Sequence, residues 1–142
     1  MTYLDMVIDE TQRMYPAAVR LDRVCNEDYE FEGIKMKKGQ LWVGAIYALH
    51  YDEELYPNPE KFDPERFNEE NRKTRDNIAH IPFGGGPRSC IAMRFAILEM
   101  KILMAVLLSK FKFVKCDQTE VSLNLRINSI TLNPGFLIHG LK

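Results

Sequence analysis

A glycine-rich turn, Phe83-Gly84-Gly85-Gly86-Pro87-Arg88-Ser89-Cys90, ends in a cysteine directly before a long apolar segment. Glycines have no Cβ, so they let backbone N–H groups approach a sulfur atom or a flat ligand closely. A thiol at the start of a helix lies near free N–H groups and the positive end of the dipole, which favours the thiolate. Arg88 adds a cation. These features indicate a ligand-binding or reactive Cys90, although a buried structural cysteine beside a tight turn fits them equally well.

Other uses of a cysteine fit the sequence less well. The C-x5-R phosphate loop of a cysteine-dependent phosphatase would need an arginine at position 96, which is Ala96. A zinc site needs about four ligands at short spacing. The cysteines and histidines are instead scattered, at Cys25, His50, His80, Cys90, Cys116 and His139. The sequence also contains no G-x-x-x-x-G-K-[ST] nucleotide loop and no C-x-x-C-H haem-attachment motif.

The segments after the glycine turn have clear periodicities. Residues 91–109 predict a helix with one broad apolar stripe, made of Met93, Ile97, Met100, Met104, Leu107 and Leu108. Alternating residues predict strands at 111–114 and 121–127. Asn133-Pro134-Gly135 is typical of a turn, after which residues 136–141 can return as a strand.

The segments before the glycine turn are shorter. Residues 4–15 recur at helical spacing, with Thr2 as the N-cap and Pro16 as the stop. Strands are expected at 19–25, 29–31 and 41–45, and residues 35–39 are interpreted as a turn between two of them. The expected fold class is α+β, with two helices, short antiparallel strands and a long ordered loop.

That loop spans residues 51–87 and contains five prolines, which exclude long regular elements. A loop of this length inside a compact domain is usually functional. Four aromatic side chains indicate that the loop is packed, namely Tyr56, Phe62, Phe67 and Phe83. Residues 68–77 form its most polar stretch, where we expect the greatest mobility.

The composition limits the remaining possibilities. The 142 residues carry 20 acidic and 19 basic side chains, and 46% are hydrophobic, which suits one soluble domain or part of one. The balanced charge gives no reason to expect nucleic-acid binding. The longest apolar run, residues 102–108, is about a third of a membrane-spanning helix. We expect no secretory signal, and three cysteines favour a reducing compartment.

Two further motifs are ambiguous when each is taken alone. Glu10 and Arg13 form an E-x-x-R pair on the first predicted helix, where such pairs are usually solvated and contribute a few tenths of a kcal/mol. Neither residue lies on the apolar stripe. Pro64-Glu65-Arg66-Phe67 lies in the proline-rich loop, where an arginine is normally exposed.

Taken together in this order, E-x-x-R, P-E-R-F and F-x-x-G-x-R-x-C resemble the C-terminal part of a cytochrome P450, a haem-thiolate monooxygenase. The resemblance covers essentially the whole chain. It is strongest toward the vertebrate microsomal drug- and steroid-oxidising family 3, subfamily 3A, in residues 3–7, 23–25, 47–50 and 93–96. One departure is Ala92, where the extended C-x-G motif more often has glycine; alanine is small enough for close packing.

The resemblance implies a role for each matching residue. Cys90 would be the axial ligand of the haem iron. Residues implied to bind the haem are Arg88, Arg23, Phe83, Gly84, Gly86 and Ala92, with the two arginines on the propionates. Glu10, Arg13 and Arg66 would form a buried structural charge network. Substrate contacts would come from Ala17, Ala18, Ser129 and Ile130, although an ordinary turn fits each segment equally well.

The implied activity is insertion of one oxygen atom from O2 into lipophilic substrates such as steroids and xenobiotics. The cofactor would be haem b and the electron donors an NADPH–cytochrome reductase and cytochrome b5. Arg94, Lys101 and Lys110 are candidates for the docking face. Residues 1–142 would be the C-terminal portion of a single domain on the cytosolic face of the endoplasmic reticulum, with the membrane anchor and the oxygen-activating A-G-x-x-T helix upstream. The alternative is a non-catalytic haem-binding or interaction fragment.

Overall fold

The computed structural model describes residues 2–114 and the backbone of residues 137–140. The chain divides into two compact units, Met1–Cys90 and Ile91–Lys142. Helices and short antiparallel strand pairs occur in both, which confirms the expected α+β class. Among the described residues, no helix is both long enough and apolar enough to cross a membrane.

The first unit begins with α1, Thr2–Met14. Thr2 is therefore the first helical residue and not the N-cap that the sequence suggested. The helix ends before Pro16, as expected, and Tyr15 N–H still donates to the Thr11 carbonyl at 2.8 Å. Five side chains of α1 are buried, and they include both apolar and charged residues: Met6, Ile8, Glu10, Arg13 and Met14.

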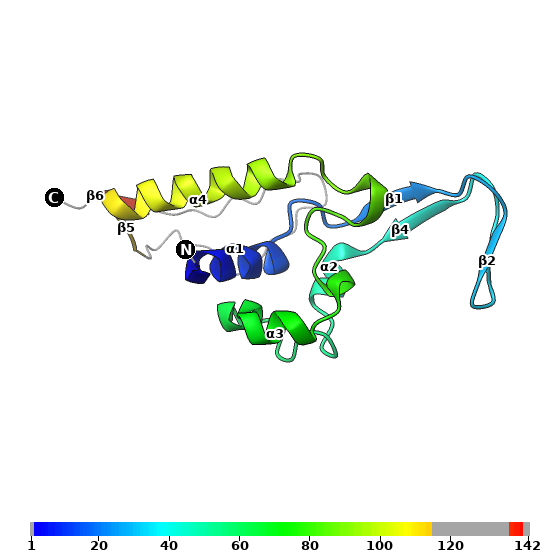
Figure 1. The fold of residues 1–142 in the computed structure, drawn as a ribbon, viewed down its shortest axis with the longest axis horizontal. Coiled ribbons are helices and arrows are strands. Elements are labelled where there is room, and N and C mark those ends of the chain that lie inside the picture. The colour runs from blue at the N-terminus through cyan, green and yellow to red at the C-terminus, as the bar shows by residue number, and fades with distance from the viewer. Residues whose placement is uncertain (1, 115–136, 141–142) are drawn as a thin grey trace. The chain divides into compact units, whose positions relative to one another are not determined.

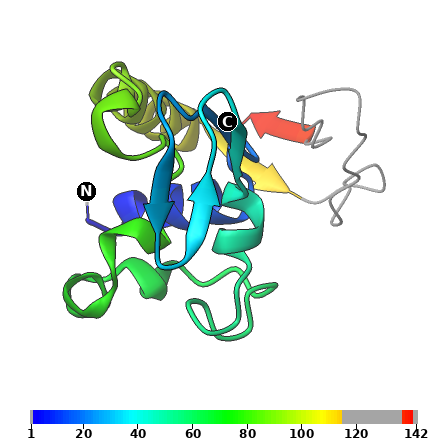
Figure 2. The same cartoon turned by 90° about the vertical axis from the view of Figure 1, so that its right-hand side faces the viewer.

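A long two-stranded ribbon follows α1 (Figure 1). Strand β1, Leu21–Val24, pairs antiparallel with β4, Leu41–Gly44, and between them β2, Tyr29–Phe31, pairs with β3, Ile34–Met36. Figure 2 shows β2 and β3 side by side. Glu32 and Gly33 both have positive φ, 48° and 80°, which is the geometry of a two-residue hairpin turn. Residues 35 and 36 are therefore strand, and only the rest of the predicted 35–39 turn leaves the pairing.

Several short helices that periodicity alone does not reveal lie between β4 and α4, most of them in the proline-rich loop. They are α2, Ile46–His50; η1, Pro64–Phe67; α3, Glu69–Thr74; η2, Asn77–Ala79; and η3, Gly86–Arg88. The polar stretch 68–77, expected to be mobile, instead contains α3. Asn68 caps this helix, because its side chain accepts a hydrogen bond from Asn71 N–H at 2.8 Å.

The aromatic residues of this segment follow the expectation of a packed loop in part. Tyr56 and Phe67 are buried and form the apolar cluster of the unit with Met6 of α1. Phe83 is half-buried, whereas Phe62 is exposed. The core of the first unit thus lies where α1 meets the loop.

The second unit contains α4, Met93–Lys110, and the antiparallel pair β5, Phe111–Val114, with β6, Leu137–Gly140. The helix begins two residues later than expected. Within the predicted stripe, Ile97, Met100, Met104 and Leu107 are half-buried while Met93 and Leu108 are exposed. The strand predicted at 121–127 and the turn at 133–135 lie outside the described residues.

Candidate functional site

The E-x-x-R pair of α1 is fully buried. Glu10 and Arg13 both have 0% exposure, and two hydrogen bonds join them, Nε to Oε2 at 2.7 Å and Nη2 to Oε1 at 2.9 Å. This bidentate geometry is the strongest form of an arginine–carboxylate contact. The common interpretation of such a pair as a solvated surface contact is therefore wrong here.

Other polar atoms of this pair contact the backbone of α2 and of the loop. Arg13 Nη1 donates to the His50 carbonyl at 2.8 Å and Nη2 donates to the Pro59 carbonyl at 2.7 Å. Glu10 Oε1 accepts from Asp63 N–H at 2.9 Å. Two buried charges are tolerated when their hydrogen bonds are satisfied in this way. The pair thus connects α1 to the end of α2 and to two positions of the loop.

Arg66 of the P-E-R-F motif is the third member of the cluster. Its Nε lies 3.5 Å from Glu10 Oε1, and its side chain is only 11% exposed. Its Nη2 donates to the Asn58 carbonyl at 2.9 Å. The structure therefore brings Glu10, Arg13 and Arg66 together around one carboxylate.

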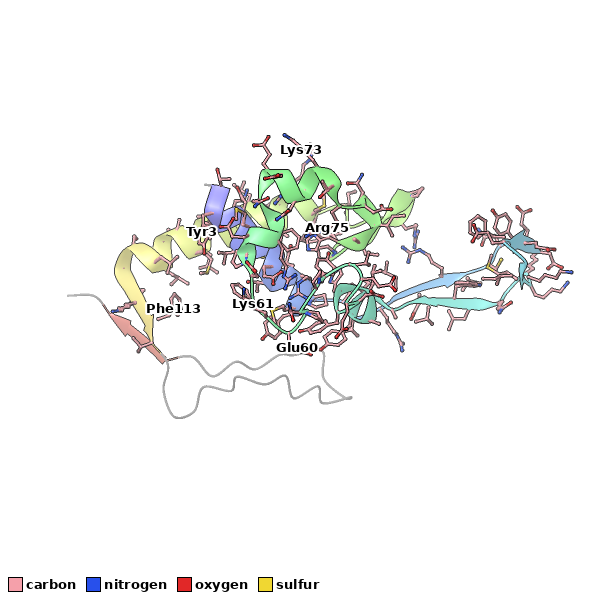
Figure 3. The ribbon with its side chains drawn as sticks, turned by 90° about the horizontal axis from the view of Figure 1, so that it is seen from below. Tyr3, Glu60, Lys61, Lys73, Arg75 and Phe113 are labelled. Atoms are coloured by element: carbon pink, nitrogen blue, oxygen red, sulfur yellow. The ribbon has the colours of Figure 1, made fainter. Side chains whose placement is uncertain are left out.

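A further arginine, which no motif of the sequence indicates, lies in the same region. Arg75, which follows α3, lies over the rings of Tyr56 and Phe67, at 4.9 and 4.6 Å from their centroids. Figure 3 shows Arg75 near the centre of this unit, whereas Lys73 on α3 points outward. Desolvation by burial lowers the pKa of Arg75 and raises that of Tyr56. The only signal in the sequence was the aromatic content of the loop, which indicated packing and not its partner.

Two histidines, His50 and His80, also lie in this region, although their spacing in the sequence indicates no metal site. His50 is fully buried and stacks on His80, with the ring centroids 5.4 Å apart. Desolvation lowers the pKa of His50 to about 4 and that of His80 to about 3. Both rings are therefore neutral at physiological pH.

The glycine-rich turn closes on itself before Cys90. Cys90 N–H donates to the Phe83 carbonyl at 2.9 Å, and Ser89 N–H donates to the Gly86 carbonyl at 3.1 Å. Gly84 and Gly86 have φ of 76° and 73°, a region that only glycine adopts readily. Cys90 is exposed, so the alternative of a buried structural cysteine is wrong.

The other residues expected to bind a cofactor have different surroundings. Arg88 is exposed in η3, and Ala92 is exposed directly before α4. Arg23 is exposed on β1, and its Nη1 donates to the Asp22 carbonyl at 2.9 Å. Gly84 packs against Leu21 of the same strand, because an added Cβ would meet the Leu21 methyl carbons at 3.6 and 3.7 Å.

The predicted substrate contacts are only partly covered by the structure. Ala17 and Ala18 are exposed in the segment between α1 and β1. Ser129 and Ile130 lie outside the described residues. Within residues 2–114, the structure does not group three or more histidine, cysteine, aspartate or glutamate side chains in a way that could hold a metal ion.

Comparison with known proteins bears on these findings. The model of the family "Cytochrome P450" matches residues 1–139. Cytochrome P450 3A31 of Mesocricetus auratus is 46% identical over 125 residues, which are 88% of this chain and 25% of the relative. Cytochrome P450 3A1 of Rattus norvegicus is 47% identical over 125 residues, with the same coverage of both chains. Cytochrome P450 3A7 of Homo sapiens is 44% identical over 130 residues, 92% of this chain and 26% of the relative.

The chain thus spans about a quarter of the length of these relatives. The match with the family model runs through all three motifs, from the E-x-x-R helix past Cys90. The expected resemblance is confirmed, and the chain belongs to the cytochrome P450 family and is similar to its subfamily 3A.

Proposed function

We propose that these residues supply the thiolate side of a haem monooxygenase, with Cys90 Sγ as the axial ligand of the iron. The observation that carries this proposal is the exposed thiol at the end of a closed glycine turn, in a chain of this family. When bound, a haem with a thiolate ligand supplies oxygen activation, by which one atom of O2 enters a lipophilic substrate.

The residues of the turn fit a haem. Thiolate is a known axial ligand of haem iron, and Cys90 offers its sulfur on the surface. A Cβ added at Gly86 would meet no atom within 4 Å, so the backbone there is open to a flat group. The hydrogen bond from Cys90 N–H to the Phe83 carbonyl holds the two ends of the turn together. Cys90 would therefore present its sulfur in one orientation, with Phe83 close to it in the same turn.

The two arginines are suited to the propionates. A guanidinium binds a carboxylate with paired hydrogen bonds. Arg88 is exposed two residues before the thiol. Arg23 shares a face of β1 with Leu21, because alternate residues of a strand point the same way. Since Leu21 contacts Gly84, this face of the strand lies toward the turn. Ala92 would add a small side chain beside the macrocycle.

The finer features of the proposal come from the family. The substrates would be steroids and xenobiotics, and Ala17 and Ala18 are accessible for such a contact. Electrons would come from an NADPH-dependent reductase, with cytochrome b5 as a second donor. Arg94 and Lys110 of α4 are exposed and could contribute to the docking face. The location would be the cytosolic face of the endoplasmic reticulum membrane.

The proposal is tested on a product that contains these residues together with the A-G-x-x-T pattern, by recording the carbon monoxide difference spectrum of its reduced, haem-loaded form. The parent should give the spectrum of a thiolate-ligated haem, and Cys90→Ala should lose it. Cys25→Ala and Cys116→Ala are matched controls and should retain it. Retention of the thiolate-type spectrum in Cys90→Ala would overturn the assignment.

A turnover assay separates catalysis from haem binding without catalysis. The 142 residues contain no A-G-x-x-T pattern, which the family uses to deliver protons to oxygen. We therefore expect no NADPH-dependent hydroxylation of a lipophilic probe by this chain with reductase, and turnover only from a product that also contains that pattern. Sustained product formation by the chain, absent in Cys90→Ala, would show that these residues suffice.

A further inference from the structure

His50 lies in the middle of a series of hydrogen bonds that connects α1 to the glycine turn. Its Nε2 accepts a hydrogen bond from Ile81 N–H at 3.2 Å. An imidazole nitrogen that accepts carries no proton, so the ring proton lies on Nδ1. Nδ1 then donates to the Arg13 carbonyl at 3.1 Å. Both ring nitrogens of this fully buried side chain are thus paired with backbone groups.

His80 makes a parallel contact with the same helix. Its Nε2 lies 3.2 Å from the Asp9 carbonyl, which can accept only from a protonated nitrogen. Asp9 and Arg13 are four residues apart, so their carbonyls lie about one turn apart along α1. The ring of His80 also packs on Phe67, with the centroids 4.7 Å apart. Residues 80 and 81 are therefore held on α1 through two stacked imidazoles.

The series of hydrogen bonds continues from Ile81 into the turn that contains Cys90. The Ile81 carbonyl accepts from Gly84 N–H at 2.9 Å, and the Phe83 carbonyl accepts from Cys90 N–H at 2.9 Å. His50 thus binds the N–H of Ile81, and the carbonyl of Ile81 accepts the hydrogen bond that closes the first bend of the turn. In the other direction, the His50 carbonyl accepts from Arg13, the buried partner of Glu10.

We propose that His50 is the positioning residue of the Cys90 turn, holding Ile81 by its Nε2 acceptor so that the thiol is presented in one place. This inference deepens the proposed haem site and rests on it for its role in ligation. The contact with Ile81 itself is independent of haem, so it can be tested without the cofactor.

Two amide substitutions separate the two ring nitrogens. The end of a glutamine side chain reaches the position of Nε2, so His50→Gln can still accept from Ile81 N–H. The end of an asparagine side chain reaches the position of Nδ1, so His50→Asn can still donate to the Arg13 carbonyl but leaves Ile81 N–H without an acceptor. His50→Phe keeps the volume of the ring and neither bond. Met6→Ala is the control for lost packing in the same unit, because it removes no hydrogen bond.

Hydrogen exchange of the haem-free chain is the first measurement. A buried amide that loses its acceptor should exchange about tenfold faster or more. We expect this increase at Ile81, Gly84 and Cys90 in His50→Asn and His50→Phe, with rates near those of the parent in His50→Gln. Met6→Ala should not reproduce this pattern. Unchanged Gly84 and Cys90 amides in His50→Asn, or equal effects of all three His50 substitutions, would overturn the inference.

The carbon monoxide difference spectrum of the haem-loaded product that also contains the A-G-x-x-T pattern is the second measurement. The thiolate-type fraction should fall in His50→Asn and return in His50→Gln, a rescue that lost packing alone does not predict. A parent product without the thiolate-type spectrum would overturn the proposed function, while the exchange pattern of the haem-free chain still decides whether His50 holds the turn. A normal spectrum in His50→Asn would overturn the positioning role alone.

Discussion

Helices α1 and α4 show opposite relations between polarity and burial. In α1, Glu10 and Arg13 are fully buried. None of the 18 residues of α4, all within the described part of the chain, is buried, and Phe95 and Leu98 are 68% and 55% exposed. The more apolar helix is thus the more exposed one. The comparison shows that hydrophobicity alone does not determine which side chains of a helix are buried. Polar side chains are buried as well where hydrogen-bond partners are available to them.

The reason lies in what each helix packs against. Near α1, the carbonyls of His50 and Pro59 accept from Arg13, and the N–H of Asp63 donates to Glu10. A charge can be buried only when such partners are present, because an unpaired buried ion is very costly. For α4, the structure places β5 against it within its own unit, which leaves a large apolar surface open.

The largest expected effect comes from breaking the buried pair of α1. Arg13→Ala should lower the free energy of unfolding of the first unit by about 3–5 kcal/mol, because Glu10 would remain buried and charged without its partner. That loss is a large part of the stability of a typical domain. Urea unfolding followed by circular dichroism measures it, and haem content should fall in the product that carries these residues.

A matched variant tests whether the lost charge is the cause. Removing both partners in Glu10→Gln with Arg13→Met replaces the ion pair by neutral side chains of similar volume and should be less destabilising than Arg13→Ala alone. Normal stability and normal haem content in Arg13→Ala would show that the pair acts as a surface contact, and the contrast with α4 would disappear.

The next effect in size concerns the pH dependence of the first unit. Burial lowers the pKa of His50 from 6.5 to about 4, and the groups that face the ring are Arg13, His80 and Tyr56. In the unfolded chain His50 is protonated below about pH 6.5, whereas in the folded chain it is protonated only below about pH 4. The stabilisation is therefore complete above pH 6.5 and is lost as the pH falls toward 4, by about 3 kcal/mol.

The comparison of His50→Gln with the parent isolates this contribution. Urea unfolding at pH 7 and at pH 4.5 should show a smaller loss of stability on acidification in His50→Gln, because glutamine does not titrate. His80→Gln should shift the profile in the same direction, since the pKa of His80 is also lowered. Identical pH profiles of the parent and His50→Gln would contradict the burial of a neutral imidazole.

Much of the fold could be predicted from local patterns. The helical repeat of residues 4–15 and the stop at Pro16 predict α1 within two residues, and the strand expected at residues 29–31 has the observed bounds of β2. The polarity of residues 68–77 predicts mobility, but the structure has a helix there, because Asn68 caps α3 and the charges of α3 suit the helix dipole. The short helix α2 is stabilised by tertiary contacts of Ile46 and His50, which no local periodicity encodes.

The site was predictable only through its motifs. Spacing indicated a helical pair at Glu10 and Arg13, but burial depends on the carbonyls of His50 and Pro59, which are distant in sequence. The same applies to His50, whose partners belong to residues 13 and 81. A polar side chain whose partners are backbone groups leaves no pattern in the sequence, because every residue carries those groups.

Smaller effects on folding are expected in α4. Phe95→Ser and Leu98→Ser should change the free energy of unfolding by no more than about 0.5 kcal/mol, since both side chains are already exposed. The same changes should raise the solubility of the 142-residue chain, because they interrupt its apolar surface. Ile97→Ser on the half-buried side is the matched control and should cost more stability. Solubility equal to the parent in both exposed variants would show that this surface does not drive association.

The smallest expected effect sharpens the contrast between two helical ion pairs of the first unit. Glu69 and Lys73 of α3 form an i,i+4 pair at 3.1 Å, with 85% and 72% of their side chains exposed, and Lys73 points outward (Figure 3). Water screens both charges, so Lys73→Ala should change stability by only ~0.3–0.5 kcal/mol, and salt should reduce that difference further. The Glu10–Arg13 pair should keep most of its effect in salt, because it is shielded from solvent.

Urea unfolding of both alanine variants at low and at high salt measures the contrast. A Lys73→Ala loss comparable to that of Arg13→Ala would show that burial does not determine the strength of these pairs.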